Sequence, residues 1–186
     1  MTNIYRVLSG NGISLFTGLA LGVLPCYIMA NAYQNNNNLV KNPSFEQEVV
    51  GDDWITKDGQ FERHHSKILK IECVHGEHYA ELASDKGYKL TQKIGVVPEE
   101  AYELAFYTQA RPRVNLKESE FLLKVDGQQL DKIQPIFEIW QKKVYRVIAQ
   151  SNQLEISFED LHFGRPGVGA MIDLVSLTRS QTSEDQ

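Results

Sequence analysis

Alternation of apolar and polar residues is the dominant pattern in the second half of the chain. Apolar side chains occupy every second position in four runs, at Tyr102–Phe106, Phe121–Val125, Tyr145–Ala149 and Leu154–Phe158. A period of two is typical of β-strands with one buried face. The second run stops at Asp126-Gly127, a pair that favours a hairpin turn. Four strands that each have one apolar face predict sheets packed against each other.

Shorter strand candidates precede these runs, at Ile68–Val74, Tyr79–Leu82 and Lys89–Ile94. No stretch between residues 39 and 177 has a sustained helical period. Many short strands at spacings near ten residues, joined by turns, favour an all-β fold over any α/β arrangement. We therefore expect an antiparallel β-sandwich of the jelly-roll type.

The first 32 residues have a different composition. Arg6 is the only charged residue before the mainly apolar run Ile13–Met29, and the small residues of Ala30-Asn31-Ala32 follow. This pattern predicts a secretory signal peptide that is cleaved after Ala32. The run is also near the minimum length of a membrane span, which would make it an uncleaved anchor. Lipidation at Cys26 is a third interpretation, although Pro25 fits a lipobox poorly.

Residues 33–186 have the length of one domain. Positions 33–38 are an asparagine-rich linker, 39–178 contain the predicted strands, and 179–186 lack apolar residues. We expect one β-sandwich domain of an exported bacterial protein, either periplasmic or secreted, that contacts a membrane only through the N-terminal segment if this is retained.

Charge and cysteine content exclude some functions. All 24 acidic residues and 18 of the 19 basic residues follow position 32, which gives a formal charge of about −6. Nucleic-acid binding needs a concentrated positive surface, so we do not expect a nucleic-acid partner. Cys73 is the single cysteine after position 32, so the mature chain has no intrachain disulfide.

A series of short motifs resembles the galactose-binding-like jelly-roll domains. Asn38–Glu46 (NLVKNPSFE) resembles their opening strand, and Trp54 follows it at the expected distance. Later landmarks follow in order, at Tyr79–Leu82, Leu90–Ile94, Tyr102–Pro112, Val125–Gly127, Trp140, Leu154–Phe158 and Ile172–Leu177. The ordered set covers nearly the whole mature chain. The resemblance implies a β-sandwich of the kind found in carbohydrate-binding modules and bacterial extracellular domains, and it does not specify the ligand.

The resemblance also implies a structural calcium ion between the first and last strands. Glu46 and Asp173 match the acidic positions that hold this ion in related modules. Asp173 has the same strand parity as Val175 and Leu177, so we expect it to face the core, where a carboxylate needs a cation or several donors. The alternative is that backbone N–H groups or a basic side chain bind Asp173. Leu174 stands where the family often has a second aspartate.

Outward positions of the strands are candidates for ligand binding. By parity they include Tyr107, Gln109, Arg111, Lys124 and Arg146. An aromatic ring stacks on a sugar ring and a guanidinium binds hydroxyl or carboxylate groups, so Tyr107 with Arg111 is the most informative combination. The alternative is that these are ordinary surface residues and that Arg111 pairs with a neighbouring acid. Aromatic residues at loop tips, namely Trp54, Phe61 and Phe163, are further candidates.

The histidines and the known catalytic motifs do not indicate a further site. The histidines His64, His65, His75 and His78 lack the partners of a recognised zinc set, so we do not expect zinc there. No nucleophile elbow, phosphate loop or paired-carboxylate motif is present, and we expect no catalysis.

Two hypotheses remain for the function. The first is a non-catalytic exported module that binds a glycan or the cell envelope. The second is a protein-interaction subunit of an envelope assembly such as a secretion complex, which predicts an exposed apolar patch. By parity, Leu122, Val144 and Ile148 point outward and favour the second hypothesis.

Overall fold

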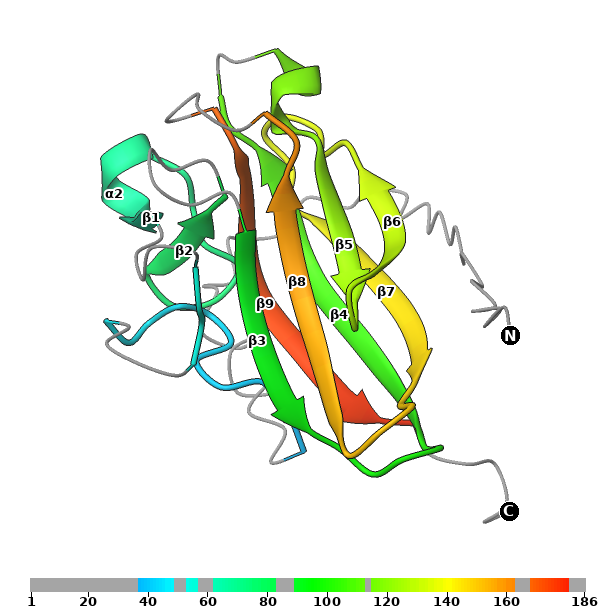
Figure 1. Ribbon diagram of the computed structural model, residues 1–186. Coiled ribbons are helices and arrows are strands. Elements are labelled where there is room, and N and C mark those ends of the chain that lie inside the picture. Colours follow the sequence, from blue (N-terminus) through cyan, green and yellow to red (C-terminus); the bar gives the residue numbers. More distant parts are fainter. Residues whose placement is uncertain are drawn as a thin grey trace, which may run out of the picture.

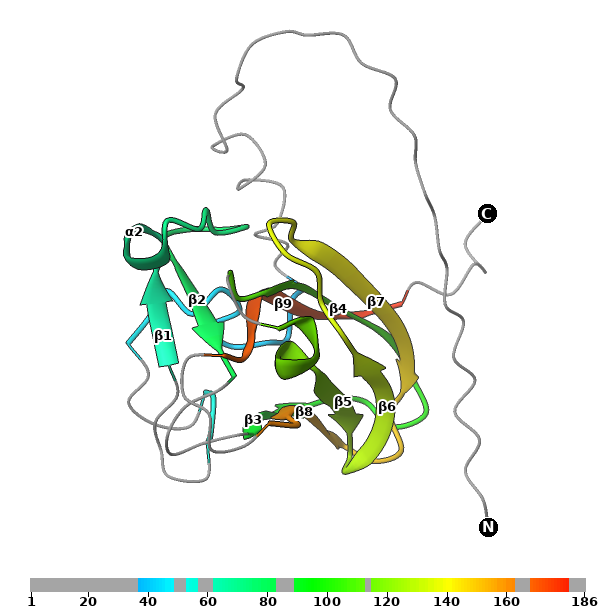
Figure 2. The ribbon, with the colours of Figure 1, turned by 90° about the horizontal axis from the view of Figure 1, so that it is seen from above.

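Two antiparallel sheets pack face to face in the computed structural model (Figures 1 and 2). The structure describes residues 37–48, 53–56, 62–82, 89–112, 115–162 and 168–180. The predicted antiparallel β-sandwich is confirmed. The predicted signal segment 1–32 and Cys26 lie outside the described residues, as do most of the linker and of the tail. In the ranges given above, no helix has the length and apolarity needed to cross a bilayer.

One sheet has five strands in the order β1-β2-β9-β4-β7, and the other has four in the order β3-β8-β5-β6. The first consists of β1 (Glu62–His65), β2 (His78–Glu81), β9 (Ala170–Arg179), β4 (Ala101–Ala110) and β7 (Gln141–Ile148). The second consists of β3 (Lys89–Gly95), β8 (Gln153–Asp160), β5 (Phe121–Val125) and β6 (Gln128–Ile133). The described residues also contain two short helices outside the sheets, α2 (Ser66–Leu69) and the 3₁₀ helix η1 (Leu116–Ser119).

The main core lies between the two sheets. Its aromatic centre joins Phe106 of the five-stranded sheet to Phe158 of the four-stranded sheet, with ring centroids 4.9 Å apart at 76°. Trp54 is buried next to Phe158, at 6.1 Å between ring centroids. Burial of one such side chain stabilises the fold by about 2–3 kcal/mol. The core residues of β4, β5, β7 and β8 are the alternate apolar positions of the sequence pattern.

The Asp126-Gly127 turn joins β5 to β6 as predicted. Both residues have positive φ, at 50° and 76°, which is the geometry of a two-residue hairpin turn. Glycine adopts this conformation without a steric cost, and aspartate tolerates it better than most residues.

The predicted strand at Ile68–Val74 is wrong. The structure has helix α2 followed by a loop. The Nδ1 atom of His65 accepts a hydrogen bond from the backbone N–H of Lys67, and Lys70 ends the helix at a φ of 56°. These local bonds satisfy the backbone without a strand partner, and Ile68 stays exposed.

The opening segment runs along β9 without forming a regular strand. The Leu39 N–H donates to the Leu177 carbonyl, and the Val175 N–H donates to the Pro43 carbonyl. Between these bonds the Asn38 side chain binds the backbone of Val175 and Leu177. A side chain thus replaces part of the backbone ladder, which is why the family-like opening strand is irregular here.

A β-bulge divides β9 into two halves. Ala105 of β4 lies opposite Ser176, whereas Tyr107 lies opposite Asp173, so β9 has one extra residue between these pairs. Leu174 lies in this interval with a φ of 48°. The extra residue reverses the parity of the strand. Val175 and Leu177 therefore face the core while Asp173 faces the opposite side of the sheet, and the prediction that Asp173 faces the core is wrong.

Candidate functional site

The five predicted ligand residues lie on opposite sides of the sandwich. Tyr107 and Gln109 of β4, Arg111 directly after this strand, and Arg146 of β7 have the parity of the outer face of the five-stranded sheet. Lys124 belongs to β5 and has the outward parity of the four-stranded sheet, where it forms an ion pair with Glu159. Alternation identified outward positions correctly, but it does not say which sheet a strand joins.

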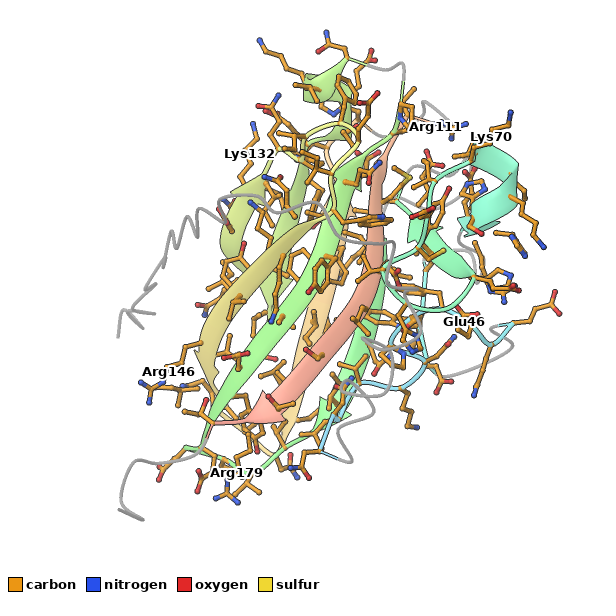
Figure 3. All side chains as sticks on the ribbon, turned by 180° about the vertical axis from the view of Figure 1, so that it is seen from behind. Glu46, Lys70, Arg111, Lys132, Arg146 and Arg179 are labelled. Carbon is orange, nitrogen blue, oxygen red and sulfur yellow. The ribbon has the colours of Figure 1, made fainter. Side chains whose placement is uncertain are left out.

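Arg111 and Arg146 lie at opposite ends of the outer face, as Figure 3 shows. Arg146 is opposite Glu103 of β4, and Arg111 follows eight residues later, just after the strand ends, which corresponds to about 27 Å of extended chain. A single sugar ring cannot contact both. The outer face must therefore be considered as two halves.

The half near Arg111 is covered by a second, smaller core. Met171, Tyr79 and Ile71 are buried there, and Cys73 and Trp140 pack against them. The Trp140 Nε1–H donates a hydrogen bond to the Glu72 carbonyl at 2.7 Å and so holds the loop after α2 against the sheet. Gln109, which lies opposite Met171, is 4% exposed. This half offers no open surface to a ligand at Gln109.

Burial also explains the properties of Cys73. It raises the pKa of the Cys73 thiol to about 12, and the nearby carboxylates of Asp173 and Glu46 add to this effect. Cys73 is therefore a small half-buried apolar side chain, and it is not a reactive thiolate.

Arg111 forms an ion pair with Glu81 of β2. Its Nη1 atom lies 2.8 Å from Oε1 and 2.7 Å from Oε2 of the Glu81 carboxylate, whose side chain is fully buried. His64 of β1 also contacts this carboxylate, and the hydrogen bonds to Glu62 and Glu81 raise its pKa to about 9. The structure thus has the alternative in which Arg111 pairs with a neighbouring acid.

The half near Arg146 is open. Tyr107 is half-buried beside Lys142, while Glu103 and Arg146 are exposed further along the same two strands. Val144 and Ile148 of β7 have the same parity and are 44% and 47% exposed. This half combines one aromatic ring, charged groups of both signs and exposed aliphatic side chains. We call it the open half, defined by Glu103, Tyr107, Lys142, Val144, Arg146 and Ile148.

Asp173 is buried on the outer face beneath the loop that follows α2. Its Oδ2 atom accepts hydrogen bonds from the Val74 and His75 N–H groups at 2.7 and 3.1 Å, and Oδ1 accepts one from the Leu174 N–H at 2.7 Å. Burial raises the Asp173 pKa to about 8, while the three N–H donors act in the opposite direction. The N–H groups therefore offset part of the desolvation of Asp173.

Glu46 anchors the other end of the same loop. Its Oε1 atom accepts hydrogen bonds from the Glu77 and His78 N–H groups, both at 2.9 Å, and its Oε2 atom lies 3.0 Å from His78 Nδ1. Gly76 has a φ of 70°, and a Cβ there would overlap the Glu46 carboxylate. Glycine at this position allows the close approach.

These contacts bear on the calcium ion that the resemblance implies. Calcium takes six or more oxygen ligands, and every carboxylate oxygen of Glu46 and Asp173 already contacts a nitrogen. The Arg63 guanidinium donates to the backbone carbonyls of Phe45 and Glu46 at 2.5 and 2.6 Å. This donor arrangement does not fit a calcium ion, whose binding stays a prediction from the sequence.

The fold is similar to solved carbohydrate-binding modules. It matches the CBM22-1 xylan-binding domain of Paenibacillus barcinonensis Xyn10C with a TM-score of 0.53 and 12% identity, over 75% of this chain and 93% of that one. It matches TmCBM61, solved in complex with β-1,4-galactotriose, with a TM-score of 0.51 and 20% identity, over 77% and 99%. The chain has a galactose-binding-like jelly-roll fold.

A further match lies within a larger enzyme. The arabinose-bound α-L-arabinofuranosidase MgGH51 aligns with a TM-score of 0.53 and 12% identity, over 78% of this chain and 27% of that one. No known family model and no curated protein matches the sequence. At these identities the similarities establish the jelly-roll fold alone, and the absence of catalysis stays a prediction.

Of the three loop-tip aromatics predicted as candidates, the structure describes Trp54, which offers no exposed ring to a ligand. Trp54 is 2% exposed, and its indole Nε1–H donates to the Asn42 carbonyl at 3.1 Å. Trp54 holds the opening segment against the core, so the interpretation of Trp54 as a ligand platform is wrong. Phe61 and Phe163 lie outside the described residues.

Proposed function

We propose that the chain is an exported, non-catalytic module that binds a glycan through the open half of its five-stranded sheet. The observation that supports this most is the half-buried Tyr107 ring beside Lys142, with exposed Arg146 and Glu103 on the same two strands. Aromatic faces stack on sugar rings, and charged side chains bind hydroxyl groups. The solved jelly rolls that share the fold include a xylan-binding domain and a module bound to galactotriose.

The split of the candidates over two faces provides a direct test. Calorimetric titration with soluble polysaccharides, including xylan and β-1,4-galactan, should give binding to the wild type. Tyr107→Ala should weaken it at least about tenfold, because loss of stacking and burial costs about 1.4 kcal/mol or more. Arg146→Ala should also weaken it.

Lys124→Ala is the matched control, since it removes a cation from the opposite face. Equal affinities in wild type and Tyr107→Ala, with loss in Lys124→Ala, would move the site to the four-stranded sheet. Failure of the wild type to bind any of these polysaccharides would reject glycan binding.

Exposed aliphatic residues on β7 support a second candidate, a protein-interaction subunit of an envelope assembly. Val144 and Ile148 are exposed as predicted, whereas Leu122 is half-buried on the other sheet. β7 is also an edge strand, so one side of its backbone is open to pairing.

A pull-down from the protein's own envelope extract separates the two candidates. Assembly predicts stoichiometric protein partners that Val144→Lys removes and soluble polysaccharide does not displace. Elution by polysaccharide, with no effect of Val144→Lys on partner recovery, would contradict it.

A further inference from the structure

Three potential metal ligands meet at the free edge of the five-stranded sheet. Glu62 and His64 alternate on β1, and Glu81 lies on β2 directly opposite Glu62. The His64 Nε2 atom is 2.9 Å from Glu81 Oε2 and 3.3 Å from Glu62 Oε2. The three ligand atoms all lie within 4.8 Å of one another. One imidazole nitrogen and two carboxylate oxygens therefore converge on one point.

The two carboxylates need a positive charge between them. Like charges directly opposite each other on neighbouring strands destabilise a sheet. Arg111 contacts both oxygens of Glu81. Among the described residues His64 is the one that contacts both carboxylates, and it does so through a single nitrogen atom. In the metal-free protein Arg111 and His64 compensate the two carboxylates, and a divalent ion in place of the His64 proton would do so with more ligand bonds.

A buried polar group without a partner lies beside the cluster. The Tyr79 hydroxyl is fully buried and forms no hydrogen bond within the described part of the chain. Its ring centroid is 5.8 Å from that of His64, and burial, followed by the Glu81 charge, raises its pKa. Buried hydroxyls are normally hydrogen-bonded, so an unsatisfied one next to His64 is consistent with a further polar partner at this cluster.

We propose that Glu62, His64 and Glu81 bind a divalent transition-metal ion, with Zn²⁺ the best match to the ligand set. Three protein ligands of nitrogen and oxygen type leave a fourth position for water, which is a common zinc arrangement. The side chains of Glu62 and His64 are 30% and 18% exposed, so the fourth position faces solvent. Arg111 orients Glu81 from behind, as outer-shell partners of metal ligands do.

This site uses a different set of residues from the histidine set considered in the sequence. His65 contacts Glu77, and His78 contacts Glu46. Those histidines hold the loop at residues 74–78 and do not join His64. Glu81, the ligand that completes the site, is 17 positions further along the chain and is brought to His64 only by β1–β2 pairing.

Calorimetric titration of tag-free, EDTA-treated and dialysed protein with ZnCl₂ tests the proposal. It should be carried out at about pH 8, where the proton competes less with Zn²⁺ for His64 than it does at neutral pH. We expect one Zn²⁺ per chain. His64→Ala and Glu62→Gln should each weaken binding at least about tenfold, because loss of a ligand costs at least as much as loss of an outer-shell partner.

His65→Ala is the control, since it removes the neighbouring imidazole and should keep the wild-type isotherm. Glu62→Gln preserves shape at a partly exposed position, so its result stands if His64→Ala fails to fold. Wild-type binding in Glu62→Gln, binding that His65→Ala abolishes, or no Zn²⁺ binding to the wild type would each overturn the proposal.

Discussion

Replacing Asp173 with alanine should lower the free energy of unfolding by about 3 kcal/mol. The substitution leaves the N–H groups of Val74, His75 and Leu174 without their acceptor, and each buried unpaired group costs about 1–3 kcal/mol. The loop N–H groups regain some hydration when the loop moves, so we expect less than the full sum. Urea denaturation at neutral pH measures this difference.

Two control variants show whether the loss of stability in Asp173→Ala comes from the lost N–H contacts. Glu103→Ala removes an exposed carboxylate from the same sheet and should change stability by less than about 0.5 kcal/mol. Asp173→Asn keeps one acceptor oxygen and should fall between wild type and alanine. A loss of stability in Asp173→Ala no larger than that in Glu103→Ala would show that the N–H anchor contributes nothing.

The raised Asp173 pKa makes the free energy of unfolding depend on pH. Its folded pKa, about 8, lies above the ordinary value, so the folded protein binds this proton more tightly than the unfolded chain. The contribution of Asp173 to stability is therefore greatest at low pH and declines as the pH rises towards 8. Measured in EDTA, the wild-type advantage over Asp173→Ala should be larger near pH 5 than near pH 9. The opposite trend, with a larger wild-type advantage near pH 9, would indicate that Asp173 stabilises the fold only when it is ionised.

The same denaturation series tests calcium. If the N–H groups alone satisfy Asp173, added Ca²⁺ should leave the wild-type midpoint where EDTA leaves it. A Ca²⁺-dependent increase in the wild type that disappears in Asp173→Ala would support the sequence-based prediction of a calcium ion.

Replacing Glu81 with alanine should also cost about 3 kcal/mol or more. The carboxylate is fully buried and compensates the charges of Arg111 and His64. Removing one partner of a buried pair leaves the other charge uncompensated and typically costs about 3–5 kcal/mol. Arg111 retains 23% exposure of its side chain, which places the expectation at the lower end of this range. Urea denaturation in EDTA measures the effect without any contribution from metal.

A double-substitution cycle isolates the coupling of the pair. The Glu81→Ala, Arg111→Ala double variant should lose less stability than the sum of the two single variants. In each single variant the remaining partner has lost the opposite charge with which it was paired, and the second substitution removes that partner. Glu159→Ala, which breaks the more exposed pair with Lys124, should cost no more than about 1 kcal/mol. Additive effects of Glu81→Ala and Arg111→Ala would contradict a coupled buried pair.

The sequence predicted the strands better than it predicted the site. Alternation located β4, β5, β7 and β8, because a strand with one buried face repeats every two residues wherever it lies in the sandwich. It could not show that Lys124 and Tyr107 lie on opposite sides, since parity defines a face relative to its own sheet. It also gave no sign that residues 66–77 cover the half that contains Gln109, because that packing joins segments far apart in the sequence.

Asp173 shows a different limit of sequence patterns. The strand pattern predicts its burial correctly but its direction wrongly, because a bulge occurs at Leu174 without the glycine or asparagine that commonly marks one. For Arg111 the sequence predicts an acidic partner as one of two alternatives. It cannot identify that partner as Glu81, because this depends on the order of strands β2, β9 and β4 in the sheet.

The β9 bulge exchanges the inward and outward positions within a single strand. Residues before it present one set of positions to the outer face, and residues after it present the other set. Met171 and Asp173 of the covered half lie before the bulge, and Ser176 and Thr178, which lie beside the part of the open half around Glu103, come after it. Single substitutions at Ser176 or Thr178 therefore leave the inward and outward directions of Met171 and Asp173 unchanged, so this end of the surface can vary without disturbing the packing of the other end.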